Sequence, residues 1–163
     1  MHPSPRRSTT AAGLALVILT AACQPQAPSF NPDDPAILAA IDSAMTVAMA
    51  GSAAGNAEQA LSITTRDSTF SFITGDVMLT GYDGILDAFR NTYASIERQD
   101  QTILERHVRV IAPDVALLTA VGEGTYTDKA GFTSEPVGLG ATIVFVRRNG
   151  TWQAVHYHQS IAK

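Results

Sequence analysis

The spacing of apolar residues predicts a helical first part of the chain and a strand-rich second part. After Pro35, apolar side chains recur every three or four positions, which is the period of an amphipathic helix. They are Ile37, Leu38, Ile41, Met45 and Met49. Pro35 is typical of a first helical position, and Asp33 or Asp34 is placed to cap the helix. The segment GSAAGN interrupts this pattern, and a short second helix is predicted around residues 57–62.

Alternating apolar and polar residues predict strands after this point. STFSFIT (residues 68–74) alternates, a Gly-Asp pair follows, and VMLTG returns, as in a hairpin. A third helix is predicted to begin near Gly81, and its apolar face contains Tyr82, Ile85, Leu86, Phe89, Tyr93 and Ile96. From Gln101 onward, turn signals in APD, DKAG and RRNG separate four long strands, and the Asn-Gly pair is a strong hairpin signal.

This order of elements predicts an α+β domain. Three helices are expected to cover one face of a curved antiparallel sheet of about six strands. With 163 residues, 45% of them hydrophobic, the chain suits one globular domain. The net charge is -4, and no run of Lys or Arg could follow a phosphate backbone, so we expect no nucleic-acid partner.

The first 22 residues have the pattern of a secretory signal peptide. Arg6 and Arg7 precede the apolar run AAGLALVIL, which is too short to span a bilayer, and small residues follow. The only cysteine is Cys23, and LTAAC resembles the lipobox of bacterial lipoproteins, in which cleavage before the cysteine leaves it carrying lipid. An ordinary secretory cleavage with Cys23 as a free thiol is the alternative. Since the signal contains two of the 11 basic residues and none of the 15 acidic ones, the mature charge is -6.

Residues 23–34 are predicted to join this lipid to the domain. After Cys23 they are rich in proline and polar residues, which resist helix and sheet formation. We therefore expect a signal peptide at 1–22, a lipidated cysteine and tether at 23–34, and a domain at 35–163. The expected location is the bacterial cell envelope, at the outer membrane or the periplasmic face, with Cys23 as the membrane attachment.

The element order and the ending GTWQAVHYHQS (residues 150–160) resemble the nuclear transport factor 2-like superfamily, in its SnoaL-like branch. The last strand is especially similar to that of the calcium/calmodulin-dependent kinase association domain. GYDGILDAF also resembles the start of the third helix of the superfamily. The resemblance implies a cone with a pocket between helices and sheet, and a homodimer formed through the outer sheet face. Such scaffolds serve as isomerases, dehydratases, cyclases, ligand binders and assembly modules, so the fold does not fix the function.

The same resemblance implies a set of pocket residues. They are Tyr82, Phe89 and Tyr93 on the third helix and Tyr157 and Gln159 on the last strand. The kinase association domain lines its pocket with arginines, but Ile143, Gly122 and Gln159 stand at those positions here. This difference favours a neutral or weakly polar ligand. Polarity alone favours the opposite face of the last strand, which carries the histidines.

His156 and His158 are the residues with the most obvious chemistry. Because residues two apart on a strand share a face, they are predicted to project together with Trp152 and Ser160. A zinc site would need a third protein ligand, and His107 is the only other histidine after the signal peptide. We therefore predict that the pair packs in or between sheets and that no metal or other cofactor is bound.

Acid–base chemistry is the other possibility that the sequence leaves open. The candidate catalytic residues are Tyr82, Glu123, His156 and His158, while Asp67 is expected to cap a turn. We expect the domain to bind a small, largely neutral organic ligand in its cone without transforming it. One alternative is a SnoaL-like isomerase, cyclase or dehydratase that uses Tyr with His or a carboxylate. A dimeric assembly module is the other alternative.

Overall fold

The computed structural model describes residues 30–162, and its elements confirm the predicted α+β class and order. The helices are α1 (Pro35–Ala53), α2 (Ala57–Ala60) and α3 (Tyr82–Tyr93). The strands are β1 (Ser71–Thr74), β2 (Val77–Thr80), β3 (Ile96–Ala112), β4 (Val115–Asp128), β5 (Val137–Arg148) and β6 (Thr151–Ile161). The predicted signal peptide and Cys23 lie outside the described residues.

Helix α1 begins as the sequence predicts, and Asp34 is its cap. The Oδ1 atom of Asp34 accepts hydrogen bonds from the backbone N–H groups of Ala36, at 2.9 Å, and Ile37, at 3.4 Å. Two otherwise unpaired donors of the first turn are thereby satisfied. Just before the helix, the carbonyl of Pro32 accepts a hydrogen bond from the N–H of Val110, at 3.0 Å. The end of the predicted tether is therefore fixed against β3.

Helix α3 is one turn shorter than the sequence predicts. It starts after Gly81, whose positive φ of 82° suits a residue without a side chain. It ends at Tyr93, and Ile96 opens β3 by pairing with Asp128 of β4. Ile96 was predicted on the apolar face of the helix because its spacing fits. The pairing with β4 overrides that local periodicity.

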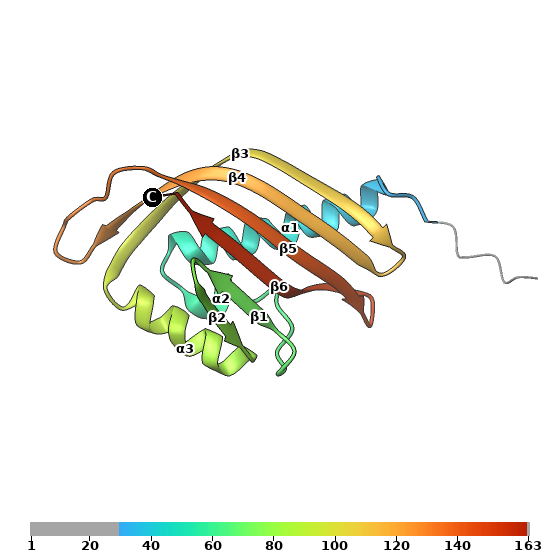
Figure 1. The fold of residues 1–163 in the computed structure, drawn as a ribbon, viewed down its shortest axis with the longest axis horizontal. Helices are drawn as coiled ribbons and strands as arrows, with labels where there is room; N and C mark the ends of the chain where they lie inside the picture. The colour runs from blue at the N-terminus through green and yellow to red at the C-terminus, as the bar shows by residue number, and fades with distance from the viewer. Residues whose placement is uncertain (1–29, 163) are drawn as a thin grey trace, which may run out of the picture.

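The six strands form one sheet in the order β2-β1-β6-β5-β4-β3. All neighbouring pairs are antiparallel except β1 and β6, which are parallel. Figure 1 shows β3 to β6 as a long curved band, with α1 running along it and α3 near the short β1–β2 hairpin. The meander pattern of the sequence did not indicate the parallel pair, which joins segments from opposite ends of the domain. The last strand of the chain therefore lies inside the sheet.

The curvature of the sheet arises from irregularities in its long strands. Register shifts interrupt the β3–β4 pairing, including one between Ile103 and Glu105, and another interrupts β5–β6 next to Phe145. Such bulges bend and twist a strand. Gly122 permits a close approach of the two strands, since a Cβ atom there would lie 2.4 Å from the carbonyl oxygen of Thr102.

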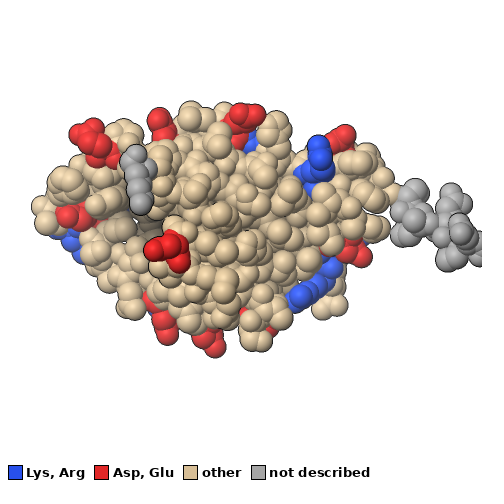
Figure 2. All heavy atoms as spheres, in the orientation of Figure 1, with Lys and Arg blue, Asp and Glu red and all other residues tan. Residues whose placement is uncertain are grey.

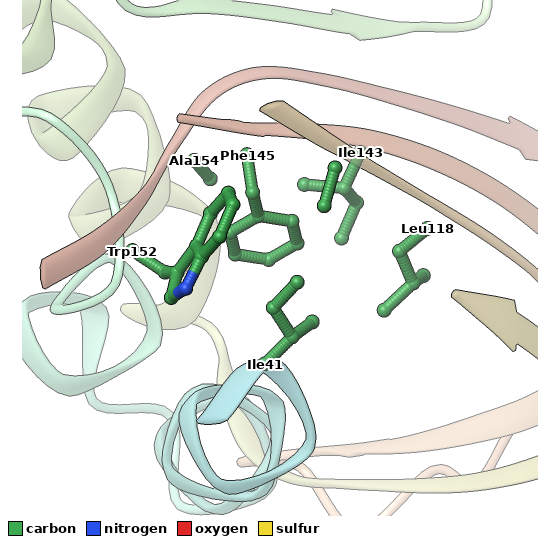
Figure 3. Close-up of a cluster of buried hydrophobic side chains, with 7 residues drawn as sticks. Ile41, Leu118, Ile143, Phe145, Trp152 and Ala154 are labelled. Atoms are coloured by element: carbon green, nitrogen blue, oxygen red, sulfur yellow. The ribbon is translucent and has the colours of Figure 1, made fainter. Parts of the chain in front are cut away.

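Two buried clusters lie on the concave side of the sheet. In the first, Ile41 of α1 packs against residues of β4, β5 and β6, as Figure 3 shows. The strand residues of this cluster are Ala116, Leu118, Ile143, Phe145, Trp152 and Ala154. The second joins α2, α3 and β1 and contains Ala57, Leu61, Phe70, Phe72, Tyr82, Ile85 and Leu86. Tyr157 packs against both clusters, and the candidate site opens between them.

Candidate ligand-binding site

A cavity of about 380 Å³ lies inside the cone, bordered by α1, α3 and the concave face of the sheet. This volume is within the range of pockets that hold small organic molecules. Its wall is largely apolar and includes Met45 and Met49 of α1, Phe89 of α3 and Ile143 of β5. Ile143 is 1% exposed, so an apolar side chain fills the position where the resemblance placed an arginine.

Strand β6 contributes Ala154, Tyr157, Gln159 and Ile161 to the cavity wall. Ala154 and Tyr157 are three residues apart, a spacing that a regular strand would place on opposite faces. A bulge explains their common direction: Phe145 pairs with Ala154 but Val144 pairs with His156, so one extra residue lies between them in β6. The inward face therefore continues from Ala154 to Tyr157.

Because of the bulge, Trp152 does not share a face with His156 and His158, so that prediction is wrong. Trp152 is 8% exposed and belongs to the concave core, whereas His156 and His158 project from the convex face together with Ser160. The Nδ1 atom of His156 is 2.8 Å from the hydroxyl oxygen of Ser71 on β1, and His158 is exposed. Both imidazoles are therefore on the opposite side of the sheet from the cavity.

The third histidine of the domain is too distant to complete a metal site with this pair. His107 of β3 lies in the same cross-strand row as His158, but Thr119 of β4 and Thr142 of β5 stand between them. Three strand spacings correspond to roughly 14 Å. Within residues 30–162, no three His, Cys, Asp or Glu side chains are grouped so that they could hold a metal ion.

Tyr93 of α3 forms a polar cluster in the cavity wall with Ser52 and Gln99. Its hydroxyl donates to the Oγ atom of Ser52, at 3.1 Å, and the Nε2 atom of Gln99 donates to the carbonyl of Ser52, at 3.3 Å. Burial raises the pKa of Tyr93, and its hydrogen bonds with Ser52 and Gln99 partly oppose this increase. The hydroxyl therefore stays protonated at neutral pH and is already engaged.

Tyr157 lies in the same cavity but its hydroxyl makes no hydrogen bond with a described residue. Edge-to-face aromatic contacts hold its ring next to Phe72, at 5.3 Å between centroids, and link Phe72 to Phe89, at 5.2 Å. Phe89 in turn contacts Tyr93, at 5.7 Å. Burial, and secondarily the proximity of Tyr93, raise the pKa of Tyr157 to about 12. This phenol is a hydrogen-bond donor, not a base, at neutral pH.

The third helix meets the cavity at one end only. Phe89 and Tyr93 line it, whereas Tyr82 does not. Tyr82 is the first residue of α3 and packs in the second cluster, with the guanidinium of Arg66 at 5.7 Å from its ring centroid. A helix of 12 residues is about 18 Å long, so its whole apolar face cannot line one small cavity.

The electrostatic character of the wall is close to neutral. Arg106 of β3 is the one guanidinium among its described residues, and its Nη2 atom is paired with Asp42 of α1, at 3.0 Å. No carboxylate or imidazole of the described chain lines this cavity. Glu123 is exposed on β4 and borders a smaller neighbouring hollow, whose lining also includes Tyr157 and Gln159. The candidate catalytic groups His156 and His158 are separated from Tyr93 and Tyr157 by the sheet, and Glu123 does not line the main cavity.

The cavity-wall residues that sequence reasoning missed include Ser52, Gln99 and Arg106. Gln99 was missed because β3 starts five residues before the predicted strand. Arg106 faces inward because the bulge after Ile103 shifts the alternation by one position. No sequence signal marks that bulge. For Ser52, the helical spacing from Met45 and Met49 would have indicated the same face.

The fold has many structural relatives. A nuclear transport factor 2-like protein from Salmonella enterica is 13% identical with a TM-score of 0.71, over 79% of this chain and 93% of that chain. A ketosteroid isomerase-like protein from Erwinia carotovora is 21% identical with a TM-score of 0.65, over 77% and 96%. At these identities the likeness shows the fold alone, which is the nuclear transport factor 2-like cone.

Comparison of the sequence itself leads to one family. No curated protein matches the chain. A structure from Xanthomonas campestris, named for the calcium/calmodulin dependent protein kinase II association domain, is 23% identical with a TM-score of 0.61, over 83% of this chain and 94% of that chain. Residues 37–163 match the profile of that same family. The chain therefore belongs to the calcium/calmodulin dependent protein kinase II association domain family, which confirms the resemblance seen in its last strand.

Proposed function

We propose that this domain binds a small, largely neutral organic ligand in its cone and does not transform it. The observation that carries the proposal is the composition of the cavity wall. About 380 Å³ of space is enclosed by mostly apolar side chains, without a carboxylate or imidazole among the described lining residues. Burial of an apolar ligand in such a space is favourable, whereas an unpaired charge would be costly.

The same composition argues against the isomerase, cyclase or dehydratase alternative. Each of these reactions needs a group that takes or gives a proton near neutral pH. The cavity offers two tyrosines with raised pKa values and one arginine already paired with Asp42. Relatives named for isomerase chemistry share the fold with this chain at identities that carry no residue roles.

Native mass spectrometry of the full chain, purified from its own envelope, tests the proposal directly. We expect a stoichiometric organic mass that is lost on mild denaturation. Ala141→Phe should abolish this mass, because Ala141 lines the cavity and a phenyl ring would occupy the space. Thr142→Phe places the same ring one residue away on the convex face and should retain the ligand. A ligand that survives Ala141→Phe, or a bound metal in its place, would contradict the proposal.

A homodimer through the convex sheet face is the second part of the proposal. This face carries cross-strand rows of uncharged residues, such as Leu117 and Val144 beside His156. In the view of Figure 2, charged side chains lie mainly at the margin. A broad central area is without them, where β5 and β6 run side by side in Figure 1. The family is named for association, which supports assembly of two or more copies.

The dimer is tested by introducing a charge into one of the uncharged cross-strand rows of this face. Leu117→Glu should give a monomer in sedimentation velocity, because a buried unpaired carboxylate opposes association. Ala50→Glu adds the same charge on the exposed side of α1 and should leave the dimer intact. A wild-type chain that sediments as a monomer would contradict the proposed homodimer.

We further propose that the chain is exported and held in the bacterial cell envelope by lipid on Cys23. The support is the sequence LTAAC after an apolar run of signal-peptide length. Cys23→Ser should leave an unprocessed precursor or release the domain into the soluble envelope fraction. A variant that is processed and remains on the membrane like the wild type would refute lipidation.

A further inference from the structure

Tyr157 carries a polar group that the fold itself leaves unused. Its hydroxyl has no hydrogen-bond partner within residues 30–162. In that region, every fully enclosed side-chain nitrogen or oxygen atom has such a partner. The hydroxyl must therefore reach accessible space, and Tyr157 lines the cavity. A phenol in this position has lost most of its water and gained no protein partner.

We propose that this hydroxyl binds a carbonyl or ether oxygen of the ligand, so that the cavity selects an uncharged, mostly apolar molecule with one oxygen acceptor at its inner end. The inference rests on the proposed function and specifies the class of ligand. Tyr157 would be the residue that orients the ligand, and the apolar wall would supply the area of contact.

The depth of Tyr157 explains why the acceptor lies at the inner end. Along the inward face of β6, Ile161 is 49% exposed, Gln159 is half-buried and Ala154 is 1% exposed. Tyr157 lies between Gln159 and Ala154 on this face, away from the exposed end of the strand. Ile103 of β3, 40% exposed, also lines the cavity, so the mouth is apolar at its rim.

Two other polar groups of the cavity wall are already engaged. The hydroxyl of Tyr93 donates to Ser52, and the guanidinium of Arg106 pairs with Asp42. Gln159 lies nearer the mouth, where water can satisfy its amide. The ring of Tyr157 is instead held by Phe72 in an edge-to-face contact, which fixes the direction of its hydroxyl.

The charge of the ligand follows from the surroundings of the phenol. The raised pKa, about 12, shows that a negative charge on this oxygen is disfavoured where it lies. A carboxylate ligand at the same place would meet the same apolar surroundings, and the guanidinium that could neutralise it is already paired. A carbonyl or ether oxygen accepts the hydrogen bond without bringing a charge.

Two probes of nearly equal shape test the inference in the purified full chain. Benzophenone carries a carbonyl between two phenyl rings, and diphenylmethane replaces that carbonyl by a methylene group. Calorimetric titration should show tighter binding of benzophenone. Tyr157→Phe should weaken benzophenone by roughly two- to tenfold, the effect of one hydrogen bond, and leave diphenylmethane unchanged. Tyr126→Phe is the control and should affect neither probe, because Tyr126 does not line the cavity.

The infrared carbonyl stretching frequency of ¹³C-labelled benzophenone is a second measurement. A general change in packing would not shift this frequency. A hydrogen bond lowers its frequency, so we expect a downward shift in the wild type and in Tyr126→Phe but not in Tyr157→Phe. Equal affinities for both probes, with no effect of Tyr157→Phe, would overturn the inference and leave the cavity as an apolar binding site. Failure of both probes to bind the wild type would overturn the proposed function, and this inference with it.

Discussion

Asp67 shows how one exposed side chain organises a turn in this fold. Its carboxylate accepts hydrogen bonds from the backbone N–H of Thr69, at 2.8 Å, and from the hydroxyl of Thr65, at 2.8 Å. The Nη1 atom of Arg148, from the end of β5, lies 3.1 Å away. These contacts join the segment before β1 to the β5–β6 hairpin, so the predicted turn-capping role of Asp67 is confirmed and extended.

The contacts of Asp67 predict a specific loss of stability in acid. The hydrogen bonds from Thr69, then the one from Thr65, lower its pKa to about 2, and Arg148 adds a smaller attraction. Since the folded pKa lies below the ordinary value, the stabilisation is complete above about pH 4 and is lost as the pH falls toward 2. Urea unfolding at pH 7, 4, 3 and 2 should show a shallower pH dependence for Asp67→Asn than for the wild type. Asp76→Asn, in the exposed β1–β2 turn, should behave like the wild type.

The raised pKa of Tyr157 predicts a loss of stability at high pH, in contrast to the loss in acid that Asp67 predicts. Because its folded pKa is raised to about 12, its contribution is complete below pH 10 and is lost as the pH rises from 10 toward 12. The free energy of unfolding of the wild type should therefore fall by about 2 to 3 kcal/mol relative to Tyr157→Phe across this interval. Urea titrations of both proteins at pH 8, 10 and 11.5 measure the difference. Parallel pH profiles would show that the phenol is not desolvated in the folded state.

At the scale of elements, two helical glycines predict opposite effects of the same substitution. A Cβ atom on Gly51 of α1 would lie 2.3 Å from the backbone nitrogen of Ala60, whereas a Cβ atom on Gly84 of α3 would meet nothing within 4 Å. Gly84→Ala should stabilise the fold by about 0.5 to 1 kcal/mol through helix propensity. Gly51→Ala should destabilise it by about 1 to 3 kcal/mol, since α1 and α2 must separate. Urea unfolding of both variants decides this, and a stabilised Gly51→Ala would disprove the close packing of these helices.

The last strand shows where sequence reasoning succeeds and where it stops. Its existence and its hairpin with β5 were predicted from Asn149-Gly150, and Tyr157 and Gln159 were placed on the inward face by resemblance. Strict alternation, however, put Trp152 with the histidines. The bulge that reverses this arises from the pairing of Phe145 with Ala154, a contact between strands that no local pattern encodes. Arg106 was missed for the same kind of reason in β3.

At the scale of the whole molecule, the cone follows from properties that the sequence does carry. Helical spacing after Pro35, the short hairpin and the turn signals between long strands were enough to predict an α+β domain with helices on one face. The cavity was predicted only through the family resemblance, because an enclosed space depends on how far the sheet bends. Close contacts such as that of Gly122 with Thr102 set that bend, and they are visible only in three dimensions.

The position of β6 in the sheet limits how early the domain can complete its folding. This strand follows all the other strands of residues 30–162, yet it lies between β1 and β5 and joins the first hairpin to the rest of the sheet. The two parts of the sheet cannot pair until β6 is available, so Ser71 of β1 must wait for its partner His156, which lies 85 positions later in the sequence. The sheet of a nascent chain therefore stays in two parts until β6 has been synthesised.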